Sequence, residues 1–119
     1  MAAAALVDMN GGTVNQTLAA ASIALQNTLG LVCDPVANRV EVPCLGRNIS
    51  AAANALTSAN VALADFAEVI PLDEVIETHN TIGRSLPREL RCTCLGGLSI
   101  TESAKKIETR LATKRPSDE

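Results

Sequence analysis

The sequence is almost without aromatic side chains, because Phe66 is the only aromatic among 119 residues and neither Trp nor Tyr occurs. Alanine dominates the apolar residues instead. Small side chains let helix axes approach closely, so we expect a core of closely packed helices. Such a core buries little apolar area per residue.

Long apolar runs and an excess of basic charge are also lacking. The apolar opening at residues 1–7 is too short to span a membrane and has no basic leader, which favours a cytoplasmic protein with no membrane partner. A net charge of -3 argues against a nucleic-acid partner. We expect the cationic residues near the end to form a solvated helix face: Lys105, Lys106, Arg110, Lys114 and Arg115.

Four cysteines are present without any sign of export, which favours reduced thiols and a metal site over disulfides. Cys33 and Cys44 each lie within two residues of a proline, Pro35 or Pro43, and the residue before a proline is biased toward extended backbone. Thiols on an irregular loop can converge on one metal centre, whereas thiols on a helix face usually only pack. The alternative interpretation is that both cysteines are small buried apolar residues. Their spacing matches no zinc-ribbon pattern.

Apolar periodicity predicts an all-α fold, a compact bundle of four to five helices with the irregular cysteine-bearing loop between the two long helices. The expected helices cover residues 2–8, 13–29, 47–50 to about 66, and 71–83, and a capping box at 99–102 starts the last one. A short extended piece is expected at 39–42. Residues 1–114 are expected to form one domain, and 115–119 a disordered tail.

Several sequence blocks occur in a fixed order along nearly the whole chain. They are LGLVCDPV (29–36), VPC (42–44) followed by Arg47 and Asn48, GRSLP (83–87) and LGGL (95–98). This series resembles the C-terminal part of the alpha-type catalytic region of iron-sulfur-dependent L-serine dehydratases, also called L-serine deaminases. The resemblance implies a lyase of amino-acid degradation and gluconeogenesis that converts L-serine to pyruvate and ammonia.

The resemblance also implies a 4Fe-4S cluster held by three cysteines, with one iron open to the substrate. Two of these ligands match Cys33 and Cys44, so we expect both to bind metal rather than act as nucleophiles. The third would fall before Met1. We therefore expect an excised fragment that is inactive alone and exposes apolar surface on the 51–65 helix; a natural short paralogue is the alternative. Cys92 and Cys94 lie outside the implied ligand set and are expected to have a structural or incidental role; the alternative is that they lie close to the cluster.

Two residues after Cys44 are candidates for substrate contact, while the catalytic residues stay unknown. Arg47 can hold a carboxylate through paired hydrogen bonds, or it can have a purely local role. Asn48 can contact the substrate or a cluster sulfide, or it can cap the following helix. His79, the only histidine, is expected on a solvent-facing helix position, so the general base would lie in the absent part.

The partners implied by the resemblance are L-serine, the rest of the alpha-type region, a beta-type domain or subunit, and further copies in a homo-oligomer. Two other functions remain open. One is a non-catalytic helical assembly or regulatory module without a cluster, and the other is a related iron-sulfur lyase that acts on another amino acid.

Overall fold

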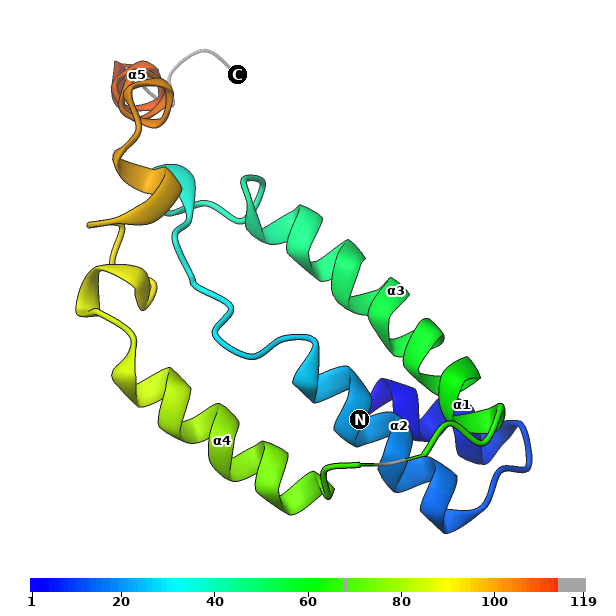
Figure 1. Ribbon diagram of the computed structural model, residues 1–119. Coiled ribbons are helices and arrows are strands. Elements are labelled where there is room, and N and C mark those ends of the chain that lie inside the picture. Colours follow the sequence, from blue (N-terminus) through cyan, green and yellow to red (C-terminus); the bar gives the residue numbers. More distant parts are fainter. Residues whose placement is uncertain (68, 114–119) are drawn as a thin grey trace. The chain divides into compact units, whose positions relative to one another are not determined.

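The computed structural model describes residues 1–67 and 69–113, and within them the chain is all-α. Its helices, in chain order, are α1 (Ala2–Met9), α2 (Val14–Gln26), α3 (Cys44–Leu63), α4 (Leu72–Ser85) and α5 (Glu102–Thr113), with short 3-10 turns η1 (Val36–Asn38), η2 (Arg88–Leu90) and η3 (Gly97–Ile100) (Figure 1). In these described ranges β-type pairing is limited to an isolated bridge between Cys33 and Arg91. The predicted fold class and the cysteine loop between α2 and α3 are confirmed, while the expected tail at 115–119 lies outside the described residues.

The start of α2 follows its sequence signal. Thr13 accepts a hydrogen bond from the Gln16 amide at 3.2 Å, and the Gln16 side chain accepts one from the Thr13 amide at 2.8 Å. Together they form a capping box, which satisfies two amide donors that have no partner within the helix. Gly30, which the sequence placed after this helix, has a φ of 72°.

The start of α3 differs from the prediction of 47–50, because the helix already begins at Cys44. The Pro43 carbonyl accepts the amide of Arg47 at 3.1 Å, so Pro43 caps the helix, where its missing N–H costs nothing. The prediction of a short extended piece at 39–42 was wrong. The chain turns there, since the Leu45 amide donates to the Val40 carbonyl at 2.7 Å.

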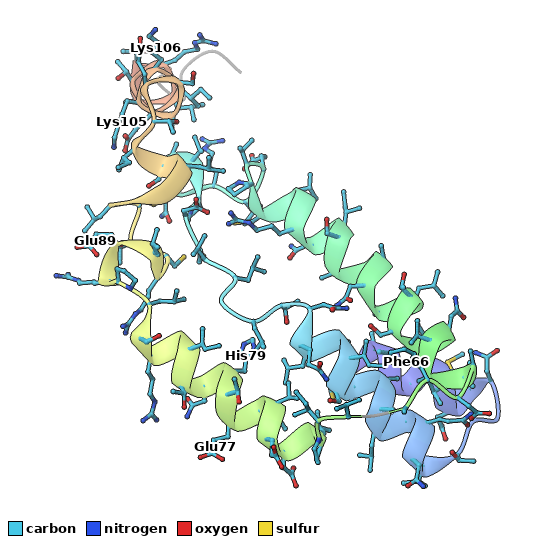
Figure 2. All side chains as sticks on the ribbon, viewed as in Figure 1. Phe66, Glu77, His79, Glu89, Lys105 and Lys106 are labelled. Atoms are coloured by element: carbon cyan, nitrogen blue, oxygen red, sulfur yellow. The ribbon has the colours of Figure 1, made fainter. Side chains whose placement is uncertain are left out.

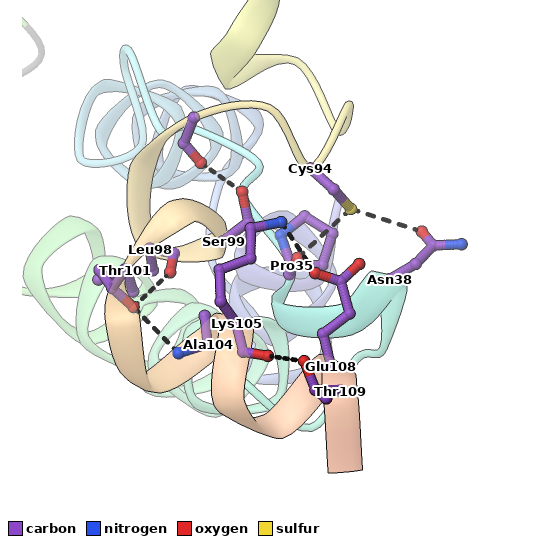
Figure 3. A network of polar contacts seen from close by, with 11 residues as sticks. Pro35, Asn38, Cys94, Leu98, Ser99, Thr101, Ala104, Lys105, Glu108 and Thr109 are labelled. Carbon is purple, nitrogen blue, oxygen red and sulfur yellow. Dashed lines mark hydrogen bonds and ion pairs between the residues drawn. The ribbon is translucent and has the colours of Figure 1, made fainter. Parts of the chain in front are cut away.

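The last helix also begins at a different cap from the one predicted. Thr101 accepts a hydrogen bond from the Ala104 amide at 3.3 Å, so Thr101 and not Ser99 caps α5 (Figure 3). Ser99 is buried and donates instead to the Gly96 carbonyl at 2.6 Å. The tight turn of η3 uses the serine hydroxyl and leaves the threonine for the helix.

The chain divides into two units, and the first consists of Met1–Leu31 and Asn48–Ser85. Its core confirms the expected packing of small residues and consists of Ala3, Val7, Ala19, Ala20, Ala55, Ala59 and Ala62. Phe66 stays outside it with 63% of its surface exposed (Figure 2). Asn54 on α3 donates to the Ala24 carbonyl on α2 at 2.9 Å, which links these two helices by a polar contact as well.

The second unit consists of Val32–Arg47 and the residues from Leu86 onward. It contains η1, η2, η3, α5 and the first turn of α3, and it holds all four cysteines. None of the helices in the described ranges combines the length and apolar character needed to cross a membrane.

Candidate metal site on the cysteine loop

The second unit brings Cys33 next to Cys92, although 58 residues separate them in the sequence. The Cys33 amide donates to the Leu90 carbonyl at 2.9 Å, and the Cys92 amide donates to the Cys33 carbonyl at 2.7 Å. These two hydrogen bonds form the isolated bridge. All four cysteines are free thiols, and Cys92 is exposed whereas the other three are partly buried.

The thiol of Cys33 has a pKa raised to about 11. Its hydrogen bond with the Cys92 side chain is the largest cause, followed by burial and by the nearby thiols of Cys92 and Cys44, while Arg47 opposes the shift. Cys33 therefore carries its proton at neutral pH. Binding of a metal to this sulfur would release that proton, because the thiolate is the ligand.

Asp34 is a buried carboxylate beside the cysteine, with 2% of its surface exposed. It accepts hydrogen bonds from Nη1 of Arg47 at 2.5 Å and from the Leu98 amide at 2.7 Å. Burial alone would raise the pKa of this carboxyl, but the two hydrogen bonds and the charge of Arg47 outweigh it, so the pKa lies below its ordinary value of 3.8. A buried carboxylate thus ties the cysteine loop to α3 and η3.

Arg47 has a local role, which the sequence left open as the alternative to substrate contact. Its Nη1 also donates to the Val32 carbonyl at 2.9 Å, so one nitrogen fixes both residues that flank Cys33. The side chain is 26% exposed. A substrate carboxylate would have to use its other guanidinium nitrogens.

Gly97 explains how Asp34 fits so close to the backbone of η3. A Cβ on this residue would lie 2.4 Å from Oδ2 of Asp34, and its φ of 62° favours glycine. In the sequence this glycine belongs to the block LGGL (95–98), which does not by itself indicate the contact with Asp34. Asp34 itself gave no signal of burial, since Asp before Pro is common in solvated turns.

Cys94 points to the loop backbone and not to another thiol. Its Sγ–H donates to the Pro35 carbonyl at 3.4 Å, close to the side chain of Asn38 (Figure 3). Both Cys92 and Cys94 have positive φ values, 60° and 57°, which are uncommon for a residue with a side chain. The two thiols nevertheless have different neighbours, Cys33 for Cys92 and the Pro35 carbonyl for Cys94.

The remaining candidates lie outside this cluster. Asn48 is an exposed residue inside α3, so it does not cap that helix. His79 on α4 is partly buried and its Nδ1 has no contact with solvent and no hydrogen-bond partner, so the expected solvent-facing position was wrong. It follows the buried Val75 by four residues and therefore shares its face of the helix, while Glu77 points elsewhere (Figure 2).

Among the residues that the structure describes, the cationic side chains of α5 form the solvated face that was expected. Lys105 pairs with Glu108 at 2.8 Å and Lys106 with Glu102 at 2.5 Å, and all four side chains are at least half exposed. Lys114 and Arg115 lie outside the described residues. Such exposed pairs contribute little to stability.

The donor chemistry of the loop fits an iron-sulfur group in part. Cys33 and Cys44 offer soft thiolate ligands from one unit, and the charge of Arg47 nearby favours an anionic centre. Across residues 1–67 and 69–113, however, no set of three or more Cys, His, Asp or Glu side chains is placed to hold a metal ion. A cluster bound here would need a further ligand.

Comparison with known proteins identifies relatives over most of the chain. The family model for the serine dehydratase alpha chain matches residues 1–99. The "L-serine dehydratase, alpha chain" of Peptoniphilus asaccharolyticus is 51% identical over 107 residues, which cover 90% of this chain and 37% of that protein. A "Probable L-serine dehydratase, alpha chain" of Bacillus subtilis (strain 168) is 50% identical over 111 residues, covering 93% and 37%.

A more distant relative has the same name without a chain designation. "L-serine dehydratase 1" of Escherichia coli (strain K12) is 44% identical over 101 residues, covering 84% of this chain and 22% of that protein. No solved structure matches the chain significantly. The chain thus spans between about a fifth and about two fifths of the length of these three relatives.

Proposed function

Because the chain belongs to the serine dehydratase alpha-chain family, we propose that it forms part of an L-serine ammonia-lyase, which dehydrates and deaminates L-serine to pyruvate and ammonia. The observation that carries the proposal is the family match over residues 1–99, which includes both Cys33 and Cys44. The cysteine loop in the second unit supports it, since Cys44 lies near enough to Cys33 to raise the pKa of the Cys33 thiol.

In this proposal Cys33 and Cys44 hold two corners of a 4Fe-4S cluster. Thiolates are the usual ligands of such clusters because they are soft donors. When bound, a cluster with three protein ligands supplies an open iron that acts as a Lewis acid toward the serine hydroxyl. The two cysteines bind and orient that centre; they are not nucleophiles.

Asp34 and Arg47 serve this site by holding its loop. Their ion pair and the contact of Arg47 with the Val32 carbonyl fix the backbone on both sides of Cys33. The remaining nitrogens of Arg47, together with the exposed Asn48, are the substrate-contact candidates of this chain. A guanidinium suits the carboxylate of an amino acid.

The rest of the active site would come from polypeptide outside these 119 residues. The matched segments cover only 37% of the Bacillus subtilis and Peptoniphilus asaccharolyticus proteins. That polypeptide would supply the third cluster ligand and the base that removes the α-proton. The name "alpha chain" of these relatives supports a beta-type domain or subunit as partner. We place the assembled enzyme in the cytoplasm as a homo-oligomer, and we expect the 119-residue chain to be inactive alone.

The test is substitution of each cysteine in the full-length enzyme that contains this chain, reconstituted anaerobically with iron and sulfide. Cys33→Ser and Cys44→Ser should each lose the visible cluster absorption and pyruvate formation from L-serine together, because a hydroxyl replaces a thiolate poorly. The matched controls Cys92→Ser and Cys94→Ser should keep the absorption. Retention of a full cluster in Cys33→Ser or Cys44→Ser, or its loss in a folded control, would refute the ligand assignment.

A further inference from the structure

Cys33 and Cys92 are held together by the backbone itself. The Cys92 amide donates to the Cys33 carbonyl at 2.7 Å, and standard bond lengths then limit the separation of their Cα atoms to about 6.6 Å. Disulfides occur at Cα separations of roughly 4.4 to 6.8 Å. The two residues are therefore within the range that a disulfide requires.

Their side chains also meet. The Cys92 side chain is the largest cause of the raised pKa of the Cys33 thiol, so the two side chains lie close together. Cys92 has a φ of 60°, and this left-handed conformation turns its side chain away from the direction that an extended residue would give it. Both thiols are free, and Cys92 is exposed to solvent, so a small molecule can reach it.

We propose that Cys33 and Cys92 are a redox pair, which closes to an intramolecular disulfide in the cluster-free chain when a low-molecular-weight disulfide is the oxidant. The exposed thiolate of Cys92 attacks one sulfur of the oxidant, forms a mixed disulfide and releases one small thiol. The Cys33 thiol then loses its proton to solvent and attacks the Cys92 sulfur. This forms the Cys33–Cys92 bond and breaks the mixed disulfide, and the second small thiol leaves as a thiolate that takes up a proton. Two protein thiols are oxidised and one small disulfide is reduced to two thiols.

The other two cysteines are placed less well for this bond. The Cys94 thiol donates to the Pro35 carbonyl at 3.4 Å and so points to the loop backbone. Cys44 contributes less than Cys92 to the raised pKa of the Cys33 thiol. Cys94 is thus a matched control, two residues from Cys92 and with a similar positive φ.

The disulfide would have a consequence for the active site. It would occupy the sulfur of Cys33, which the proposed function assigns to the cluster, so cluster assembly would require prior reduction. This step rests on the proposed function, whereas formation of the disulfide does not. Thiol exchange is reversible, so the block would be removed by a small thiol.

The experiment uses the 119-residue chain purified without iron, fully reduced, and then incubated with oxidised glutathione. Alkylation and peptide mapping by mass spectrometry should show two thiols protected and one peptide that links Cys33 to Cys92. Cys94→Ser should give the same linked peptide. Cys92→Ser and Cys92→Ala should not, with their far-UV circular dichroism unchanged to show that the fold persists.

Other mapping results would overturn the proposal. These are a Cys33–Cys44 or Cys92–Cys94 bond as the main product, or glutathione mixed disulfides only.

For the cluster step, the full-length enzyme is oxidised in the same way before iron and sulfide are added. Cluster uptake should be lost in the wild type, restored by dithiothreitol, and retained in Cys92→Ser. If wild-type enzyme in which peptide mapping shows the Cys33–Cys92 disulfide takes up as much cluster as the reduced enzyme, the disulfide does not block assembly. If the reduced enzyme takes up no cluster, that result counts against the proposed function instead.

Discussion

Gly97 leaves room for the carboxylate of Asp34. A Cβ on residue 97 would lie 2.4 Å from Oδ2 and 2.7 Å from the Cβ of Asp34, closer than real atoms approach. The same approach allows the next amide, that of Leu98, to donate to this carboxylate at 2.7 Å. Gly97 thus leaves space for the buried carboxylate through which Asp34, the residue after Cys33, is hydrogen-bonded to η3.

Gly97→Ala should therefore destabilise the chain by roughly 2 kcal/mol or more, because the new methyl group meets a buried carboxylate and the residue has a φ of 62°. Gly83→Ala is the matched control. It lies inside α4 with nothing near its Cβ position, so it should leave stability unchanged or raise it by about 0.5 to 1 kcal/mol. Urea unfolding followed by far-UV circular dichroism measures both, and equal effects would contradict the steric argument.

Asp34→Asn should cost about 2 to 3 kcal/mol, since it leaves the largely buried Arg47 guanidinium without its counter-charge. The chain offers a surface pair for comparison. Arg39 and Glu41 lie 3.9 Å apart with side chains more than half exposed, so Glu41→Gln should change stability by less than about 0.5 kcal/mol. Thermal unfolding of the three proteins tests the contrast, and a comparable loss in both variants would show that burial does not matter here.

The Asp34 carboxylate also predicts a dependence of stability on pH. Its pKa in the folded chain lies below the ordinary value of 3.8, so the ionised form is favoured by folding. The resulting stabilisation is fully present above the unfolded pKa and is lost as the pH falls through the folded pKa. The stability difference between wild type and Asp34→Asn should thus shrink from about pH 5 toward pH 2. A difference that stays constant over this range would refute the linkage, and the subtraction removes the effect of other carboxylates.

Much of the helical framework was predictable because its signals are local. Thr13 and Gln16 form the capping box that their spacing indicates, and the alanines of α2 and α3 build the core that an aromatic-poor sequence requires. The boundary errors have local causes too. Pro43 caps α3 because its carbonyl is available at the first turn, and Thr101 replaces Ser99 as the cap of α5 because η3 uses the serine hydroxyl.

The candidate site was predictable only in its cysteine loop, because its other contacts join distant segments. Two contacts join residues far apart in the sequence: the bridge between Cys33 and Arg91 spans 58 positions, and the hydrogen bond from Leu98 to Asp34 spans 64. Neither contact produces a periodic pattern in the sequence. The sequence suggested a substrate role for Arg47, yet its pairing with Asp34 depends on this tertiary arrangement. The closeness of Cys92 to Cys33 depends on the same contacts, so the sequence offered proximity to the cluster only as an alternative to a structural role.

The exposed face of α3 predicts self-association of the 119-residue chain. Ile49 and Leu56 lie seven positions apart on this helix, hence on one face, and are 64% and 54% exposed. Exposed apolar patches of this kind mark surfaces that are covered in an assembly, and longer relatives offer polypeptide to cover this one. Sedimentation velocity should show a concentration-dependent increase in mass, which Ile49→Ser combined with Leu56→Ser should reduce without loss of helix content. Val14→Ser, at an exposed apolar position on the first residue of α2, is the control that should leave association unchanged. A chain that remains monomeric at all concentrations, or a double variant that associates like the wild type, would show that this face needs no partner.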